Sequence, residues 1–186
     1  MKELQLHYHH VQISRCLEES TRAQHPFTSP DSPLVMWIDG MDQSFWAVPR
    51  MKAGRTPKCL DGMVRPRVKV VGCWSFHLGV HFYLAHDSDP KDSSLTVELL
   101  ARTIENARTV SERLNKPMPR TVLIWADNTS RENKNNCCLT YLASLIGSDQ
   151  FQLAGLLSHM MGHTHSVLDQ LFWCCEQILP AHPNPH

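Results

Sequence analysis

The chain contains no CxxC pair, although it has seven cysteines in its 186 residues. An odd number of cysteines without that spacing argues against a disulfide framework and a cysteine zinc site, and it favours a reducing compartment. The chain also has no apolar run of the about 18 residues that a membrane-spanning helix needs. Its first ten residues, MKELQLHYHH, have no apolar signal core. We therefore expect neither a membrane partner nor export.

Net charge is also lacking, because 18 basic and 18 acidic residues balance to zero. The total therefore provides no electrostatic argument for a nucleic-acid partner. What the chain does have is a 42% share of hydrophobic residues, which is typical of a globular protein and argues against a disordered one. Its length suits one domain with a sizeable core.

The first 33 residues differ in composition from the rest of the chain. Residues 1–20 can form a short helix, and the stretch STRAQHPFTSPDSP is rich in Ser, Thr and Pro, as linkers are. We expect residues 1–33 to be a peripheral helix and linker. Residues 34–180 should form the domain, and residues 181–186 should be a tail.

β-Branched and aromatic residues mark the strands of the first half of the domain. LVMWIDG, residues 34–40, is a short apolar run that ends in an acid. VKVVGCWSFHLGV, residues 68–80, and HFYLAHD, residues 81–87, follow with little between them. These two segments predict either a hairpin or one long bent strand followed by another strand.

The second half of the domain alternates helices and strands. LTVELLARTIENARTVSERLN has helical spacing of its apolar residues, with Ser93 or Ser94 as the candidate N-cap. TVLIWADN has a continuous apolar run, as expected of a centre strand buried on both faces. ENKNNCCLTYLASLIGS predicts a helix ending at Gly147, FQLAGLLSHM predicts a strand at 151–160, and a last helix is closed by Pro180.

The order of elements is therefore β-β-β-α-β-α-β-α. Antiparallel strands come first, and alternating units with right-handed crossovers follow. This is the order of the ribonuclease H-like fold, which transposases and integrases share, so we predict an α/β mixed sheet with helices packed on it. The predicted core consists of side chains from the centre strand and the last two helices, namely Val122, Ile124, Leu142, Leu145 and Leu171.

Acids lie where two of the predicted strands end. Asp39 follows the first apolar run, and Asp127 follows the run TVLIWA. In alternating α/β sheets, ligands collect outside the carboxyl ends of the strands. If these two strands are neighbours, their carboxylates can hold Mg²⁺ or Mn²⁺, and a pair of such ions can activate water at a phosphodiester. Asp42 is a reserve for Asp39, and an ordinary helix cap within DNTSREN is the alternative for Asp127.

A pair of histidines precedes or begins the last helix. In GHTHSVLDQ, His165 and Asp169 are four residues apart on one helix face, and His163 lies just before the helix. Imidazole and carboxylate together suit zinc, manganese or iron. The alternative is that the two histidines only hydrogen-bond near the first turn of the helix, and the pattern leaves both roles open.

Two further groups of charged residues allow a functional interpretation. Glu98 lies early in the long helix, where it is either a further metal ligand or a solvated residue of the helix face. One loop is basic, and it either contacts the phosphates of a nucleic acid or is solvated. Its basic residues are Arg50, Lys52, Arg55, Lys58, Arg65, Arg67 and Lys69.

Three motifs together carry a resemblance to a known family. WIDGMDQ, ADNTSRENKNN and GHTHSVLDQLF occur in this order within residues 34–175. They resemble an uncharacterised domain family of eukaryotic, transposon-related proteins with the patterns DGMDQ, DNxxxENKN and GHTHxxxDQ. The resemblance implies a ribonuclease H-like, transposase-derived domain. It also implies an acidic triad of Asp39, Asp127 and Asp169, with the motif neighbours Asn128, Asn133, Lys134, Asn135, His163 and His165.

These observations predict a domain that uses Mg²⁺ or Mn²⁺ to cut or join nucleic acid, with DNA as the expected partner and the nucleus as the expected location. The three aspartates would hold the metal, and His163 or His165 would orient a carboxylate or contact the scissile phosphate. One alternative is a catalytically inactive, domesticated domain that acts as a binding or assembly module. Another is a hydrolase with zinc or iron at the two histidines and Asp169, in which Asp39 is dispensable.

Overall fold

The computed structural model describes most of the predicted domain. Its described residues are 27, 29–41, 58, 62–75, 78–86, 88–127, 135–158 and 167–178, and within the last range side chains are described for residues 168–174. The helix expected within residues 1–20, the reserve acid Asp42, the stretch 128–134 and both motif histidines lie outside the described residues.

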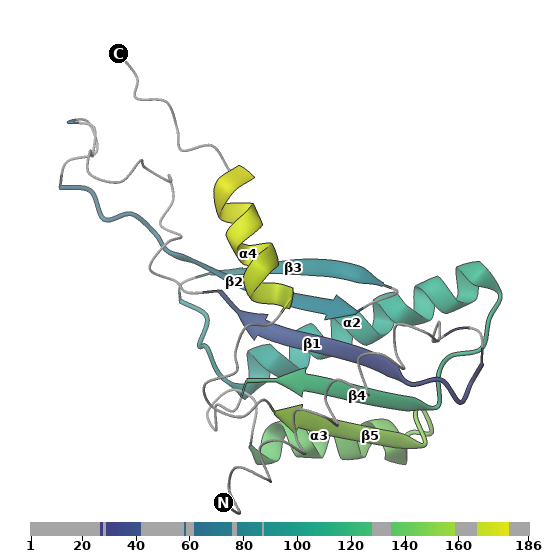
Figure 1. The fold of residues 1–186 in the computed structure, drawn as a ribbon. Helices are drawn as coiled ribbons and strands as arrows, with labels where there is room; N and C mark the ends of the chain where they lie inside the picture. The colour runs from purple at the N-terminus through teal and green to yellow at the C-terminus, as the bar shows by residue number, and fades with distance from the viewer. Residues whose placement is uncertain are drawn as a thin grey trace, which may run out of the picture.

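Five strands form one mixed sheet (Figure 1). They are β1 (Leu34–Gly40), β2 (Val68–Ser75), β3 (Gly79–His86), β4 (Thr121–Ala126) and β5 (Leu153–Ser158), in the spatial order β3-β2-β1-β4-β5. β2 pairs antiparallel with β1 and β3, whereas β4 is parallel to β1 and to β5. This strand order, with the element order β-β-β-α-β-α-β-α, confirms the predicted ribonuclease H-like mixed sheet.

The segments around residues 68–87 form a hairpin. β2 and β3 pair antiparallel along their whole length, from Val68 opposite His86 to Ser75 opposite Gly79. Gly79 has a φ of 78°, a left-handed conformation that glycine adopts without steric penalty. Of the two arrangements that the sequence allowed, the structure therefore has the hairpin and not the bent strand.

The centre strand is β1, and the prediction that TVLIWA forms the centre is wrong by one position. β4 lies between β1 and β5, so it is internal but not central. Both strands are apolar runs with buried side chains on both faces. A continuous apolar run reports burial on both faces, which internal strands share, and it carries no information about strand order.

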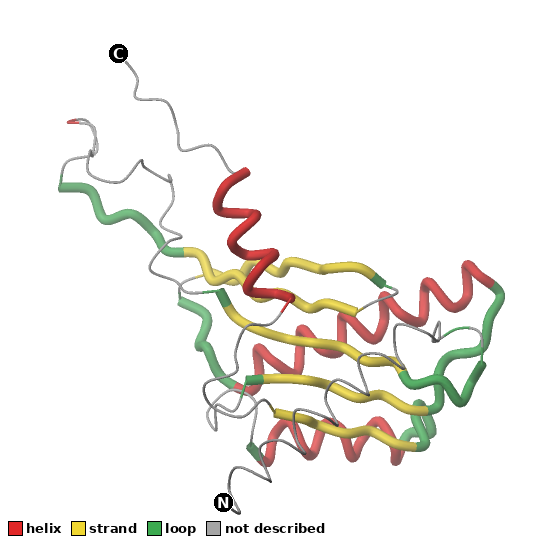
Figure 2. Tube along the Cα trace, viewed as in Figure 1, coloured by secondary structure: helices red, strands yellow, loops and turns green. Residues whose placement is uncertain are grey.

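Helices cover both faces of the sheet (Figure 2). α2 (Ser93–Leu114) and α3 (Asn136–Gly147) pack on one face. α4 (Val167–Ile178) lies on the other face, against β1 and β2. No helix among the described residues is long and apolar enough to cross a membrane.

The N-cap of α2 is Asp92, so the prediction of Ser93 or Ser94 is wrong. The Asp92 carboxylate accepts hydrogen bonds from the backbone N–H groups of Ser94, at 2.9 Å, and of Leu95, at 3.4 Å. Asp and Ser cap helices about equally well. Residue type alone therefore could not decide between three consecutive candidates.

α3 begins at Asn136, later than the predicted start at Glu132. Its N-cap is Asn135, whose side-chain oxygen accepts a hydrogen bond from the backbone N–H of Cys138 at 3.1 Å. The capping role that was the alternative for Asp127 therefore belongs to Asn135.

Two cores form, one on each face of the sheet, because side chains alternate along a strand. In β1, Leu34, Met36 and Ile38 belong to the core shared with α2 and α3. Val35 and Trp37 belong to the core shared with α4. Both cores therefore meet at the central strand, whose carboxyl end carries the first of the predicted site residues.

The predicted core is confirmed except at Leu171, which is only partly buried. α4 contacts the sheet through Leu168 and Phe172, which are four residues apart on one helix face and are both buried. Leu171 lies beside that face. The predicted residues that are buried as expected are Val122, Ile124, Leu142 and Leu145.

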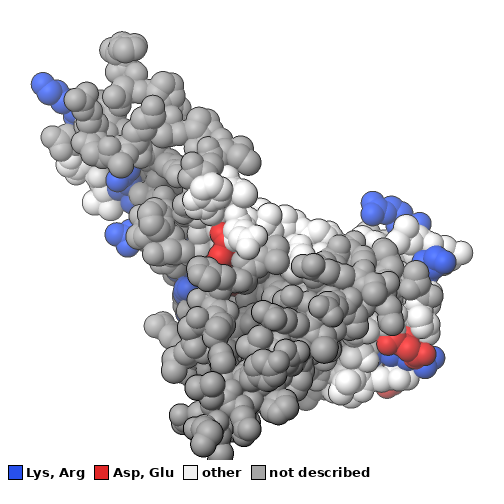
Figure 3. Space-filling model, viewed as in Figure 1, with Lys and Arg blue, Asp and Glu red and all other residues white. Residues whose placement is uncertain are grey.

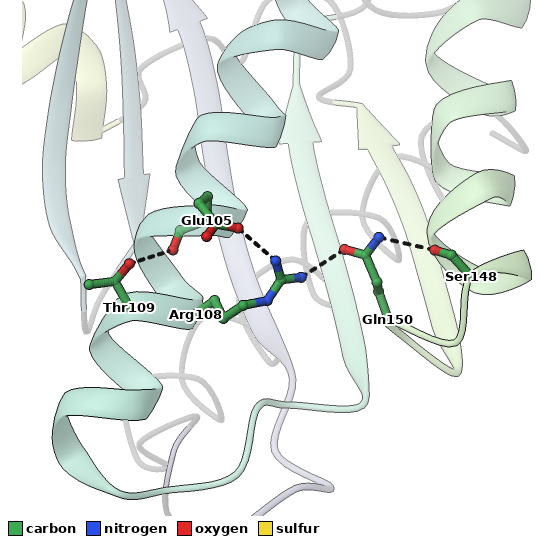
Figure 4. Close-up of polar contacts among 5 residues, drawn as sticks. All are labelled: Glu105, Arg108, Thr109, Ser148 and Gln150. Carbon is green, nitrogen blue, oxygen red and sulfur yellow. Dashed lines mark hydrogen bonds and ion pairs between the residues drawn. The ribbon is translucent and has the colours of Figure 1, made fainter.

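A chain of polar side chains ties α2 to the connection between α3 and β5 (Figure 4). Arg108 contacts the carboxylate of Glu105 at 2.6 Å and donates to Oε1 of Gln150 at 2.8 Å. The amide of Gln150 in turn donates to the hydroxyl of Ser148 at 3.0 Å. Because these side chains are exposed, each contact contributes less than about 1 kcal/mol. Their effect is to position the entry into β5.

Phe27 and the residues after it pack on the domain. Phe27 is 1% exposed and belongs to the core shared with α2 and α3. The C=O of Pro30 accepts a hydrogen bond from the N–H of Arg120 at 2.8 Å. Residues 1–26, residue 28 and the tail 181–186 lie outside the described residues, so the predicted domain boundaries stay a prediction.

Candidate functional site

Two acids lie side by side at the carboxyl ends of β1 and β4. These strands are parallel neighbours, and their last paired residues are Ile38 and Ala126. The next residues of the two segments are Asp39 and Asp127. The sequence predicted a shared site only on the condition that these strands are neighbours, and their pairing meets that condition.

Asp169 comes to the same place because α4 packs closely on β2. A Cβ on Gly72 would be 2.8 Å from Cδ2 of Leu168 and 3.1 Å from Cζ of Phe172, so both side chains lie directly over this glycine. Gly72 is opposite Asp39 in the pairing of β1 with β2. Cβ positions of directly opposed residues are about 4.5–5.5 Å apart. The contact on Gly72 therefore brings the first turn of α4 beside Asp39.

The charges of Asp127 and Asp169 both act on the carboxylate of Asp39. The pKa of Asp39 is raised from 3.8 to about 6, first because burial removes water from the carboxylate, and then because the charges of Asp169 and Asp127 repel it. The N–H of Gly40, which donates to Oδ1 of Asp39 at 2.8 Å, and the charge of Lys91 lower this pKa. Burial and like charges outweigh them, as they do where carboxylates share a site.

A cavity of about 90 Å³ adjoins this cluster. Its charged lining comes from Asp39, Asp127, Lys91 and Asp92, and apolar side chains of β1, β2 and α2 complete its wall. The cavity is open to solvent on one side and has room for water molecules or a phosphate group.

Lys91 and Asp92 are site residues that the sequence analysis missed. Both belong to SDPKDSS, whose composition is that of an ordinary turn. They reach the site because the N-terminal end of α2 lies beside the carboxyl end of β1. No local signal distinguishes a lysine in such a turn from a solvated one, so only the packing of α2 on the sheet reveals it.

Glu98, predicted as a metal ligand, is not brought to the site. Its carboxylate contacts Nε of Arg102 at 2.7 Å, and 57% of its side chain is exposed. Thr96 and Leu99 of the same helix line the cavity, whereas Glu98 does not. Because successive helical residues are rotated around the axis, a residue between those two faces a different way. We therefore leave Glu98 out of the ligand set.

The remaining motif residues divide into those that the structure describes and those that it does not. Asn135 is described, and it caps α3. The roles predicted for His163 and His165 stay predictions, because both lie outside the described residues. The same holds for the reserve acid and three motif neighbours, namely Asp42, Asn128, Asn133 and Lys134.

Lys69, predicted to lie in the basic loop, is instead a residue of β2 with a structural role. Lys69 is buried, and its ammonium group donates to the backbone C=O of Asp89, so it holds a neighbouring loop and is not available to phosphate. On the face shown in Figure 3, Lys and Arg side chains gather along the segment that precedes β2 and at the far end of α2. Phosphate contacts stay a prediction for the other described residues of the loop, Lys58, Arg65 and Arg67.

The donor set fits a hard divalent cation in its chemistry. Mg²⁺ and Mn²⁺ prefer carboxylate oxygens, and two carboxylates, from the end of β4 and from α4, act on that of Asp39 in β1. Within the part of the chain that the structure describes, no three Asp, Glu, His or Cys side chains are close enough to share one ion.

A comparison with known domain families finds one match. The family described as "Domain of unknown function (DUF7869)" matches residues 59–183, which is more than half of the chain. Asp127 and Asp169 lie within this range, and Asp39 precedes it. A comparison with curated protein sequences finds no match.

Among solved structures, Mos1 complexes are similar to this chain. The crystal structure of a pre-cleavage Mos1 transpososome has a TM-score of 0.49 at 11% identity, covering 93% of this chain and 49% of that chain. The Mos1 mariner paired-end complex with Mn has a TM-score of 0.43 at 12% identity, covering 88% and 52%. The chain thus spans about half the length of these solved chains. TM-scores below 0.5 do not establish a relationship.

Proposed function

We propose that this chain, a member of the DUF7869 family, is a transposase-derived domain. It would cut or join the phosphodiester backbone of nucleic acid. DNA is the proposed substrate, and Mg²⁺ or Mn²⁺ at Asp39, Asp127 and Asp169 is the proposed cofactor. The observation that carries the proposal is the partly buried Asp39 carboxylate, on which the charges of two other carboxylates from separate elements act.

The ionised Asp39 carboxylate destabilises the metal-free fold. Its shift in pKa from 3.8 to about 6 corresponds to about 3 kcal/mol at neutral pH. A buried acid with a purely structural role is normally paired with a cation or with several N–H donors. Here burial and two like charges prevail over the N–H of Gly40 and the charge of Lys91. Groups perturbed in this way concentrate at functional sites, and a bound cation would turn the repulsion into attraction.

Divalent cations at this site would supply a Lewis acid and an activated water at the scissile phosphate. The residues of the chain would fix the geometry. Asp39 and Asp127 extend from neighbouring parallel strands, whose hydrogen-bonded ladder sets their separation. Asp169 is positioned by α4 through the contact of Leu168 with Gly72.

Two other functions receive less support. A zinc or iron hydrolase at His163, His165 and Asp169 has no need of Asp39, yet Asp169 acts directly on the pKa of Asp39. An inactive binding or assembly module has no need of three mutually repelling carboxylates. The second of these functions remains a distinct outcome of the experiment, because a module of that kind need not bind Mg²⁺ or Mn²⁺.

Calorimetric titration with Mn²⁺ tests the proposal. The wild-type protein should bind Mn²⁺, and Asp127→Asn should lose this binding because it removes one charged ligand while leaving the metal-free fold intact. Asp149→Asn is the matched control, since it makes the same chemical change at a φ of 55°, which Asn tolerates, at the opposite end of the sheet from the site. A wild-type protein without any heat of Mn²⁺ binding would contradict the proposal.

Cleavage and joining of DNA and RNA duplexes in Mn²⁺ provide the second measurement. An active domain should process DNA in the wild-type and Asp149→Asn forms and should leave it intact in the Asp127→Asn form. A wild-type protein that binds Mn²⁺ but leaves every nucleic acid unchanged would be the inactive module.

A further inference from the structure

Lys91 lines the same cavity as Asp39 and Asp127. Its Nζ and Cε atoms are 3.3 Å from the position that a Cβ would take on Gly40, the last residue of β1. Its charge lowers the pKa of Asp39. The cation is thus directed at the site and not away into solvent, as that of a typical surface lysine is.

The loop that carries Lys91 is held on both sides. Before it, the C=O of Asp89 accepts a hydrogen bond from the ammonium of Lys69, and the backbone N–H of Asp89 donates to the C=O of His86 at 3.1 Å. The Asp89 carboxylate also accepts from the N–H of His86 at 2.9 Å. After it, Asp92 caps α2. Because the backbone is already held in place, a ligand contact by Lys91 costs side-chain entropy but little further backbone entropy.

We propose that Lys91 binds a phosphate of the nucleic-acid backbone at the carboxylate site, an inference that rests on the proposed function for the identity of the ligand. Three aspartates repel a phosphodiester, and a protein cation beside them reduces this repulsion even before any metal ion binds. Lysine has donors and no acceptor, and its compact ammonium binds phosphate as a point charge. Lys91 can therefore attract the substrate without taking part as a metal ligand.

The size of the cavity indicates which part of the nucleic acid Lys91 would contact. The cavity of about 90 Å³ has room for a phosphate group. Contacts to phosphate position a nucleic acid but do not read its sequence. Lys91 should therefore contribute to affinity equally for all sequences.

Duplex DNA binding, measured by fluorescence anisotropy in EDTA at several salt concentrations, tests this inference. Each phosphate contact contributes about 0.9 to the slope of log K against log salt for duplex DNA. Lys91→Gln should weaken binding several-fold at low salt and reduce the slope by about this amount. Lys91→Arg should keep the wild-type slope, because it keeps the charge.

The matched control is Lys116→Gln, which removes the same charge beyond the opposite end of α2. A Lys91→Gln slope equal to that of Lys116→Gln would overturn the inference and leave Lys91 as a counter-charge for Asp39. Absence of duplex binding by the wild-type protein would overturn it as well. The calorimetric Mn²⁺ titration is independent of these DNA-binding measurements. A protein that binds no Mn²⁺, but whose salt slope falls in Lys91→Gln, would refute the proposed metal chemistry alone.

Discussion

Gly72 of β2 lies directly opposite Asp39 of β1, and the space left by its missing side chain is filled by α4. Leu168 and Phe172 contact the glycine from above, and Asp169 follows Leu168 in the chain. The close approach of a helix to one glycine therefore sets the position of the third carboxylate relative to the first.

Gly72→Ala should separate the third carboxylate from the other two. The new Cβ would be 2.8 Å from Cδ2 of Leu168 and 3.1 Å from Cζ of Phe172, so these side chains, or α4 with them, have to shift. We expect a loss of about 1–3 kcal/mol in the free energy of unfolding, as for other overpacked sites, and weaker Mn²⁺ binding by calorimetry. Gly147→Ala is the control, because no atom lies within 4 Å of its new Cβ. Equal stability and Mn²⁺ affinity in the two variants would refute this positional role.

Asp39→Asn should stabilise the metal-free protein in a pH-dependent way. The pKa of Asp39 is raised on folding from 3.8 to about 6, so the wild-type protein has the full benefit of the protonated acid below pH 3.8 and loses it as the pH rises through about 6. The variant keeps a neutral side chain throughout. In urea melts, the free energy of unfolding of the variant should equal that of the wild type near pH 3.8. It should exceed it by about 3 kcal/mol at pH 7. An advantage that does not change with pH would contradict the raised pKa.

Ile124→Ala should destabilise the domain strongly. Ile124 is 0% exposed in β4 and belongs to the core shared with α2 and α3. Truncation of a buried Ile removes packed methylene groups and leaves a cavity, so the free energy of unfolding should fall by about 2–5 kcal/mol in denaturant melts. Leu139→Ala on the exposed side of α3 is the comparison, and it should cost less than about 1 kcal/mol.

Asn135→Ala and Asp127→Ala should have opposite effects on stability. Asn135 caps α3 by accepting from the N–H of Cys138, and loss of an N-cap costs about 0.5–2 kcal/mol. Asp127 has no such role in α3, and its removal relieves repulsion with Asp39. Thermal melts of the metal-free proteins should therefore show a lower melting temperature for the first variant only. A clear loss of stability in Asp127→Ala would indicate a structural role for that residue.

Local sequence predicted the order of the helices and strands and most of their extents. The run LVMWIDG coincides with β1, and the helical spacing after residue 93 coincides with α2. Such patterns depend on residues only a few positions apart, because strands alternate with a period of two and helices repeat every 3.6 residues. The same locality explains the error at the start of α2, where Asp92, Ser93 and Ser94 are equivalent by residue type.

Strand order and side-chain direction were decided by packing over long distances in the chain. Nothing local places β1, and not β4, at the centre of the sheet, since both are buried apolar runs. No local sequence pattern predicts that Glu98 points away from the cavity or that Lys91 lines it. Both depend on how α2 packs on the sheet. These features exist only once the elements have assembled.

The candidate site depends both on local sequence and on long-range packing. The sequence alone places Asp39 and Asp127 at the ends of apolar strands, and a glycine at position 72. Only the fold makes those strands neighbours, sets Gly72 opposite Asp39 and brings α4 onto it. The raised pKa of Asp39 is decided by the tertiary structure alone. Desolvation and charge repulsion depend on distances through space, and these are set when residues far apart in sequence pack together.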